Sequence, residues 1–251
     1  MDAEKILSKY KIKPDAILDQ HFLNDEDLVD ELLEDLKIDS KDIVFEVGPG
    51  IGTFTSRIRK SKKIIAVEID PKLCTVLKKE VECEIICGNA LHYVTQKKFT
   101  KLVSSTPYSI CEPLLRKLFV VDFEIALVIV PEGFATKILE NSTIFGLITN
   151  EFLEITKTTE VPSSKFFPVP KTSSNALVIQ KKPKSHVQEF LLQDDKLAKN
   201  ALRETLAKMG ITKKKAKEQI NTAFKKQILE KKVNLLTFDE LGEILAFLKG
   251  F

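Results

Sequence analysis

The segment IVFEVGPGIGTFT, residues 43–55, decides how this 251-residue chain folds. Its first five residues suit a buried strand, and they run directly into a turn that contains Gly48, Gly50 and Gly52. A strand followed by a glycine turn and a helix lets backbone N–H groups approach a ligand closely, because glycine has no Cβ to hold the ligand away. The segment therefore predicts a ligand-binding turn at the end of a central strand, with a purely structural turn as the alternative.

Two polar side chains at the ends of later strands indicate that the ligand carries a nucleoside. Glu68 lies 20 residues after Gly48, at the end of the apolar run 63–68, where a carboxylate can accept hydrogen bonds from both ribose hydroxyls. Asn89 follows the next apolar run, 84–87, and can reach an adenine ring. The glycine spacing is G-x-G-x-G rather than the G-x-G-x-x-G of dinucleotide sites, so an NAD-dependent enzyme is the less favoured interpretation.

Apolar runs of strand length alternate with helical stretches through the first half of the chain. The predicted strands are 42–47, 63–68, 84–87, 101–104 and 124–130, and the predicted helices include 71–80 and 112–119. This alternation is typical of βαβ units, which build a mostly parallel sheet with helices on both faces. We predict an α/β fold with a Rossmann-like domain.

Three further segments belong to this predicted large domain. Residues 24–36 have the apolar spacing of an amphipathic helix, with Asn24 as its N-cap. Residues 144–155 and 176–179 are expected to add antiparallel strands, on either side of the proline-rich segment 161–170, which is expected to be an ordered loop.

The composition changes near residue 183, where lysine-rich helix formers begin. We predict a large domain over 1–183 and a small helical domain over 184–251. Residues 181–251 hold 16 Lys and Arg against 9 Asp and Glu, a balance that suits a polyanion such as RNA, because neutralised phosphates release counterions. A solvated lysine-rich surface explains the charge equally well. The candidate RNA-binding residues are Lys213, Lys214, Lys215 and Lys217.

The amino terminus and the cysteines bear on the compartment. The first residues carry mixed charge and no long apolar run follows them, so we expect neither a signal peptide nor a membrane span, and a cytoplasmic protein. The cysteines at 74, 83, 87 and 111 lack paired C-x-x-C spacing, so we expect thiols rather than a metal site or disulfides.

Five motifs occur together in the order and spacing of one enzyme family. They are DQHFL at 19–23, EVGPG at 46–50, VEID at 67–70, STPY at 105–108 and FFPVPK at 166–171. They resemble the G-Q-x-F-L, E-I-G-P-G, V-E-x-D, N-L-P-Y and F-x-P-x-P-K motifs of the ribosomal RNA adenine dimethyltransferases of the KsgA type. The resemblance covers roughly residues 17–180, and no single motif carries it.

The resemblance implies a class I methyltransferase that uses S-adenosylmethionine to dimethylate adenines of small-subunit ribosomal RNA during ribosome biogenesis. It implies a partner in that RNA or the small ribosomal subunit, and no metal. The lack of a long apolar run predicts no membrane partner, and a monomer is the default expectation. The cofactor-binding residues that it implies are His21, Leu23, Gly48, Gly50, Gly52, Glu68, Asn89 and Ser105. The catalytic residues that it implies are Ser105, Pro107, Tyr108 and Phe166, with the two aromatic rings stacked on an extruded base.

Two positions depart from the family pattern. Ser105 replaces an asparagine, and its hydroxyl is a shorter acceptor that can also donate. Asn89 replaces an aspartate. These changes leave open a catalytically weak or inactive member that acts as an rRNA-binding assembly factor, and a small-molecule methyltransferase is a third alternative. Tyr108 and Phe166 as core aromatics, and His21 as an ordinary surface or core histidine, also remain alternatives.

Overall fold

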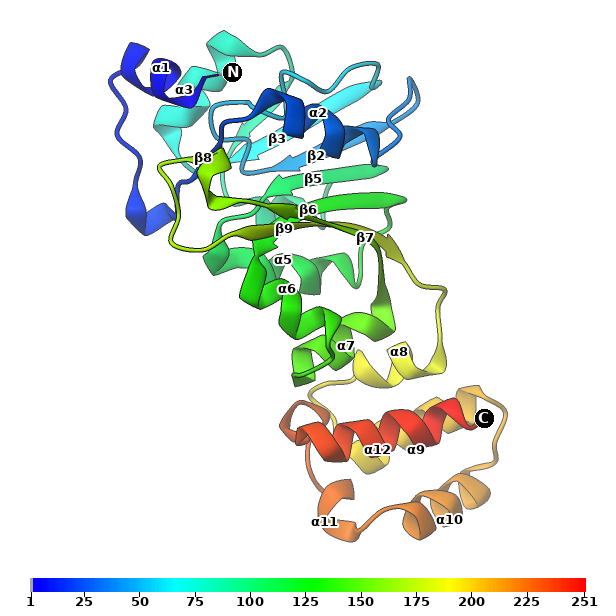
Figure 1. Ribbon diagram of the computed structural model, residues 1–251. Helices are drawn as coiled ribbons and strands as arrows, with labels where there is room; N and C mark the ends of the chain where they lie inside the picture. The colour runs from blue at the N-terminus through cyan, green and yellow to red at the C-terminus, as the bar shows by residue number, and fades with distance from the viewer. Residues whose placement is uncertain (1) are drawn as a thin grey trace. The chain divides into compact units, whose positions relative to one another are not determined.

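The computed structural model describes residues 2–251 and is built around a seven-stranded sheet (Figure 1). The strands are β2 (Ile43–Val47), β3 (Lys63–Glu68), β4 (Glu84–Cys87), β5 (Lys101–Ser105), β6 (Ile125–Pro131), β7 (Leu153–Val161) and β9 (Ser174–Lys181), in the order β4-β3-β2-β5-β6-β9-β7. Neighbouring strands from β4 to β6 are parallel, and β9 is antiparallel to both β6 and β7. The predicted Rossmann-like α/β fold is confirmed.

Helices precede the first of these strands and occupy several of the connections between them. They are α1 (Ala3–Lys9), α2 (Glu26–Glu34), α3 (Pro71–Glu80), α4 (Ala90–Tyr93), α5 (Cys111–Leu118), α6 (Glu132–Leu139) and α7 (Ile144–Phe152), with short 3-10 turns η1 (Ala16–Leu18), η2 (Tyr108–Ile110) and η3 (Ser163–Lys165). A separate two-stranded sheet joins β1 (Phe22–Leu23) to β8 (Phe166–Phe167). The proline-rich segment is therefore ordered, as expected, and is paired with the chain near residue 22.

The start of α2 differs from the prediction by one residue. Asp25, not Asn24, is the N-cap, because the Asp25 side chain accepts a hydrogen bond from the backbone N–H of Leu28. The Asn24 side chain instead accepts from the N–H of Ala3 and so links the start of α1 to this segment. Both residues are suitable N-caps by type, and only the tertiary contact with Ala3 separates their roles.

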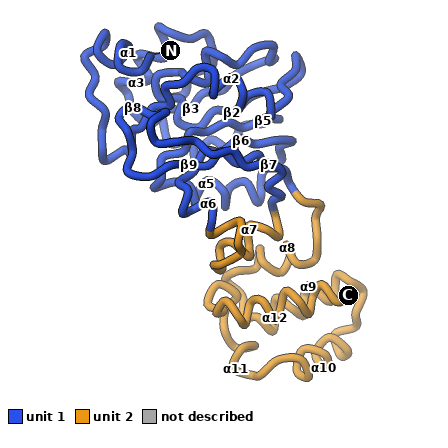
Figure 2. The backbone as a smooth tube through the Cα atoms, in the orientation of Figure 1, with its two compact units in different colours: residues 1–136, 153–181 blue, residues 137–152, 182–251 orange. Residues whose placement is uncertain are grey.

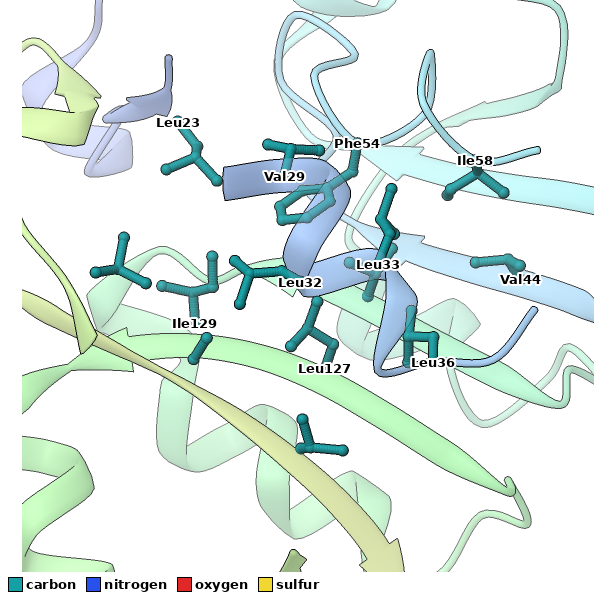
Figure 3. Close-up of a cluster of buried hydrophobic side chains, with 14 of the residues drawn as sticks. Leu23, Val29, Leu32, Leu33, Leu36, Val44, Phe54, Ile58, Leu127 and Ile129 are labelled. Atoms are coloured by element: carbon teal, nitrogen blue, oxygen red, sulfur yellow. The ribbon is translucent and has the colours of Figure 1, made fainter. Parts of the chain in front are cut away.

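One face of the sheet is covered by α2. Val29, Leu32 and Leu33 of the helix are buried in a cluster that includes strand residues of β2, β5 and β6. Figure 3 shows Leu32 of α2 next to Leu127 and Ile129, and Val29 next to Phe54. The apolar spacing of the helix is thus satisfied by the sheet, which carries the strand ends that form the site.

The predicted antiparallel strand over 144–155 is wrong in its first part. Residues 144–152 form α7, and only from Leu153 does the chain run as β7. Buried Gly146, Thr149 and Phe152 recur every three residues, which is the spacing of one helix face. The Thr143 hydroxyl accepts the N–H of Gly146 and starts the helix. An apolar run of this length fits either element by pattern alone.

The chain divides into two compact units (Figure 2). One contains residues 1–136 and 153–181, and the other contains residues 137–152 and 182–251. The second unit therefore includes α7, which the sequence analysis assigned to the large domain. Within this unit Glu151 explains the grouping, because it pairs with Lys249 at 2.5 Å and its carbonyl accepts from Gln188 at 2.8 Å.

The second unit is helical. Its further elements are α8 (His186–Leu191), α9 (Ala198–Lys208), α10 (Lys213–Ala223), α11 (Lys226–Leu229), η4 (Val233–Leu235) and α12 (Phe238–Lys249). Thr237 and Glu240 form a capping box at the start of α12. No helix within residues 2–251 is both long and apolar enough to cross a membrane.

The expectation of four free thiols is wrong for Cys74 and Cys87, which form a disulfide. Helix α3 packs beside β4 and brings the two Cα atoms to 6.0 Å, within the usual range for such a bond. Spacing in the sequence does not reveal this proximity, because it depends on how the helix returns over the sheet. Cys83 and Cys111 are free.

Candidate active site

A cavity lies at the carboxyl ends of β2, β3, β4 and β5, where open parallel sheets usually bind ligands. The segment 17–23 also contributes to its wall. Of the residues predicted from the sequence, the cavity is lined by His21, Leu23, Gly48, Gly50, Glu68, Asn89, Ser105 and Pro107. Gly52, Tyr108 and Phe166 do not line it. One cavity therefore contains most of the predicted cofactor residues together with the start of the predicted target-base loop.

The glycine turn has a left-handed backbone conformation, which glycine adopts at no steric cost. Gly48 and Gly50 have φ of 64° and 61°. A Cβ on Gly50 would lie 3.0 Å from the ring of Phe22, so a side chain there would need the ring to move. Gly52 has a different part in the turn, because its N–H donates to the carbonyl of Pro49 at 2.8 Å and closes the bend.

Glu68 is fixed at the end of β3 by two backbone donors. The N–H of Gly50 donates to one carboxylate oxygen and the N–H of Asp70 to the other, each at 2.9 Å. Burial raises the pKa of Glu68 above its ordinary value, and the backbone donors oppose that shift. Each oxygen keeps a further lone pair, so the carboxylate is oriented and can still accept from two hydroxyls.

A second buried carboxylate, Glu46, lies in the cavity wall, and sequence reasoning did not assign it a role. It is 2% exposed, and the hydroxyl of Thr55 donates to it at 2.6 Å. Burial raises its pKa to about 7, and the neighbouring charge of Glu68 acts in the same direction. Glu46 thus gains a proton near neutral pH while Thr55 holds its position.

Asn89 lies at the start of α4. Its Oδ1 accepts the N–H of Leu91 at 2.9 Å and caps the helix. This leaves the amide group as the end that can meet a ligand, so the side chain is a donor toward the cavity. An aspartate at this position would offer an acceptor there instead, and the departure from the family pattern therefore changes the polarity of this contact.

The backbone that enters the target-base loop, residues 105–108, is held by buried hydroxyls. The Thr106 hydroxyl donates to that of Ser104 at 2.9 Å, and the Ser104 hydroxyl donates to the carbonyl of Val47 at 3.1 Å. The N–H of Thr106 donates to the carbonyl of Ile129. These bonds fix Ser105 between two buried neighbours and leave its side chain half-buried at the cavity.

The two predicted stacking aromatics occupy different environments. Tyr108 is half-buried, its hydroxyl lies 3.1 Å from that of Ser174, and its ring stacks on His21 at 6.4 Å between centroids. Phe166 is 6% exposed and packs in the cluster that contains Leu23. The structure therefore places Phe166 in the core, since β8 pairs with β1 and turns its ring inward.

His21 and several unpredicted residues complete the wall. His21 Nδ1 lies 2.7 Å from the carbonyl of Pro168. Ile17 and Ile69 line the cavity although they are 90% and 54% exposed, which gives its rim an apolar surface. Asp19 also lines it. Ile69 could have been recognised as an apolar residue between two acids at a strand end, but nothing local marks Ile17.

The four predicted RNA-binding lysines all lie on α10 and are exposed. Lys213 and Lys217 line a hollow between α9 and α10, together with Lys196, Asn200, Arg203, Glu204 and Ala207. Within residues 2–251 none of the four predicted lysines forms an ion pair. Lys214 and Lys215 lie outside the hollow.

Comparison with known proteins gives one consistent family. The sequence model of the ribosomal RNA adenine dimethylase family matches residues 13–241. A protein of Pyrococcus abyssi named "probable ribosomal RNA small subunit methyltransferase A" is 31% identical and one of the same name from Pyrococcus furiosus is 32% identical. Each match spans 97% of this chain and 95% of the relative.

Solved structures share the fold. A dimethyladenosine transferase from Plasmodium falciparum aligns with a TM-score of 0.64 at 23% identity, over 91% of this chain and 98% of that one. The 23S rRNA methyltransferase ErmE aligns with a TM-score of 0.59 at 17% identity, over 91% and 99% of the two chains. The strand order and the glycine turn with its acidic partner agree with these matches. The family match over residues 13–241 shows that this chain belongs to the ribosomal RNA adenine dimethylase family.

Proposed function

We propose that this protein transfers methyl groups from S-adenosylmethionine to adenines of small-subunit ribosomal RNA and dimethylates them during ribosome biogenesis. One observation carries the proposal: the glycine turn, Glu68 and Ser105 line a single cavity. A donor held by the first two groups would therefore share one cavity with Ser105, the first residue of the predicted target-base loop. The curated relatives carry the name of a small-subunit RNA methyltransferase.

The residues of the cavity fit this cofactor. Backbone conformation at Gly48 and Gly50 keeps the turn free of side chains, so the main chain can approach the ligand. Glu68 offers two oriented oxygens to ribose hydroxyls, and Asn89 offers an amide to a ring nitrogen of adenine. Ile69 supplies an apolar surface for the adenine face. The cofactor, when bound, supplies an electrophilic methyl group on a sulfonium.

The chain's own contribution to catalysis is positioning and hydrogen bonding. The exocyclic amine of adenine is a poor nucleophile, because its lone pair is delocalised into the ring. Acceptors that hold its hydrogens turn the lone pair toward the methyl group. We assign this role to the Ser105 hydroxyl and the backbone carbonyls near Pro107, and we assign the stacking role to Tyr108. We assign Phe166 a structural role, because it packs in the core behind the cavity wall, and we do not assign it contact with the substrate base.

The lysines of α10 support a contact with RNA phosphates. Lys213, Lys214 and Lys215 lie in the first turn of the helix, where positive charge opposes the helix dipole and does not stabilise the helix. They have no acidic partners among residues 2–251. A polyanionic partner accounts for cations held at that position.

The test is methylation of small-subunit RNA, or of immature small subunits, by the purified chain with S-adenosylmethionine, followed by mass spectrometry of the adenines. We expect dimethyladenosine at defined positions. Ser105→Ala removes the side-chain acceptor and should lower kcat about tenfold, the value of one hydrogen bond. Ser105→Asn, which has a side-chain acceptor, should keep kcat at or above the wild-type value. If wild type binds RNA without turnover, and only the Ser105→Asn variant methylates it, the protein is instead an assembly factor.

Two finer predictions accompany this function. We infer a monomer, which light scattering of the purified protein tests, and a cytoplasmic location, which cell fractionation tests. A small-molecule methyltransferase would lack salt-dependent RNA binding, so a filter-binding assay over a range of salt concentrations separates that alternative from the proposal.

A further inference from the structure

Three consecutive side chains, at residues 19–21, contact three different loops around the cavity. Gln20 Nε2 donates to Asp70 Oδ2 at 2.9 Å, beyond the end of β3. His21 Nδ1 lies 2.7 Å from the carbonyl of Pro168, which can only accept, so this nitrogen carries the proton. Asp19 Oδ2 accepts the backbone N–H of Ser109 at 3.2 Å. Of these contacts, the one made by Asp19 reaches the end of the target-base loop.

The backbone at Asp19 does not itself require an acidic residue. Asp19 has φ of 50° and ψ of 40°, the left-handed conformation that glycine, asparagine and aspartate adopt most readily. The family motif has glycine at this position, and glycine would hold the same backbone. The carboxylate is therefore an addition to the motif in this chain, and its contact needs a separate explanation.

The group that it binds is a backbone donor at the start of a helix. Ser109 lies in η2, which leads into α5, and the first N–H groups of a helix have no partner within it. Asp19, 90 residues earlier in the chain, supplies the acceptor. At its other end the target-base loop is held by the N–H of Thr106 on Ile129. The loop is thus fixed at both ends, by the sheet before it and by Asp19 after it.

We propose that Asp19 is a positioning residue that holds the target-base loop, residues 105–108, against the cavity through the N–H of Ser109. The inference rests on the proposed methyl transfer, since its purpose is to place Ser105 and Tyr108 for the base. Asp19 acts on the reaction through the loop and not by contact with the methyl group. The structure also explains how a loop with the shorter Ser105 acceptor is kept in a defined place.

A pair of matched variants tests the proposal in the full-length protein. Asp19→Gly keeps the left-handed backbone and removes the acceptor, whereas Asp19→Asn keeps both. We expect Asp19→Gly to lower kcat for RNA methylation about tenfold, the value of one hydrogen bond to a charged group, with the Kd for S-adenosylhomocysteine unchanged. Asp19→Asn should retain kcat within about threefold, because its carbonyl still accepts.

Hydrogen exchange provides a readout that does not depend on turnover. The amide of Ser109 should exchange faster in Asp19→Gly than in wild type or Asp19→Asn, while the amide of Thr106 stays protected. Unchanged exchange and unchanged kcat in Asp19→Gly would overturn the proposal, and a weaker Kd with unchanged kcat would make Asp19 a cofactor ligand instead. If wild type shows no turnover, the proposed function fails, and the exchange of Ser109 still decides whether Asp19 holds the loop.

Discussion

The two sides of the cavity are built in different ways. On the cofactor side, the glycine turn and Glu68 lie at the ends of neighbouring parallel strands, and Gly50 and Glu68 bond to each other directly. On the target side, Ser105 is followed by a loop that is held by contacts from distant segments, including Asp19 and Ser174. The first side is specified by local sequence and strand order. The second side requires the whole chain to be folded.

The largest effect should come from Phe166, which is buried in the hydrophobic cluster that contains Leu23. Phe166→Ala removes a ring that is 6% exposed, and we expect it to lower the free energy of unfolding by about 3–5 kcal/mol in a denaturant titration. Tyr108→Ala, at a half-buried position, should cost less. A stable Phe166→Ala protein that has lost only turnover would return Phe166 to the role of stacking on the base.

Glu68→Gln tests whether the cofactor side binds the cofactor independently of RNA binding. In Glu68→Gln one carboxylate oxygen becomes an NH2 group, which faces the backbone N–H of Gly50 or Asp70 and cannot accept from it. The variant also has one acceptor fewer for the ribose hydroxyls. We expect the Kd for S-adenosylhomocysteine, measured by calorimetry, to rise about 100-fold, near the upper value of one hydrogen bond to a charged group. RNA affinity should not change. An unaltered Kd would mean that another group binds the ribose.

Glu46→Gln tests the cofactor side through the pH dependence of stability. Because burial raises the pKa of Glu46 from 4.5 to about 7, the folded state retains its proton longer than the unfolded state. Wild type should therefore lose stability as pH rises from about 4.5 to about 7. Glu46→Gln removes this loss and should be more stable than wild type at pH 8 by about 3 kcal/mol, with little difference at pH 4. A difference in the free energy of unfolding between the two proteins that is the same at pH 4 and pH 8 would contradict this.

The smallest effect should come from lysines outside the cavity. Replacing Lys213 and Lys217 together by alanine should weaken RNA binding roughly threefold to tenfold and reduce the slope of log affinity against log salt by about 1.5. The matched control is Lys249→Ala, since that ammonium already pairs with Glu151. Cofactor affinity should be unchanged in both. Equal losses in the two variants would argue against a specific contact by α10.

What the sequence predicts follows the same division. The parallel strands and the residues at their ends, Glu68 and Asn89, were predictable, because buried strands appear as apolar runs and their ends share one edge of the sheet. The burial of Phe166 was not, since it depends on the pairing of β8 with Leu23 in β1. The helix 144–152 was also missed, because an apolar run of that length does not reveal its period.

The path of the chain through residues 137–152 limits how this protein can be divided or recombined. The chain enters the second unit at residue 137, within α6, and continues through α7. It then returns to the sheet as β7 and β9, and it enters the second unit again at residue 182. A fragment that starts at 182 lacks the partners that Glu151 provides to Lys249 and Gln188. A chimera that takes its helical unit from a relative therefore needs two junction regions, and the transplanted piece must carry α7 with it.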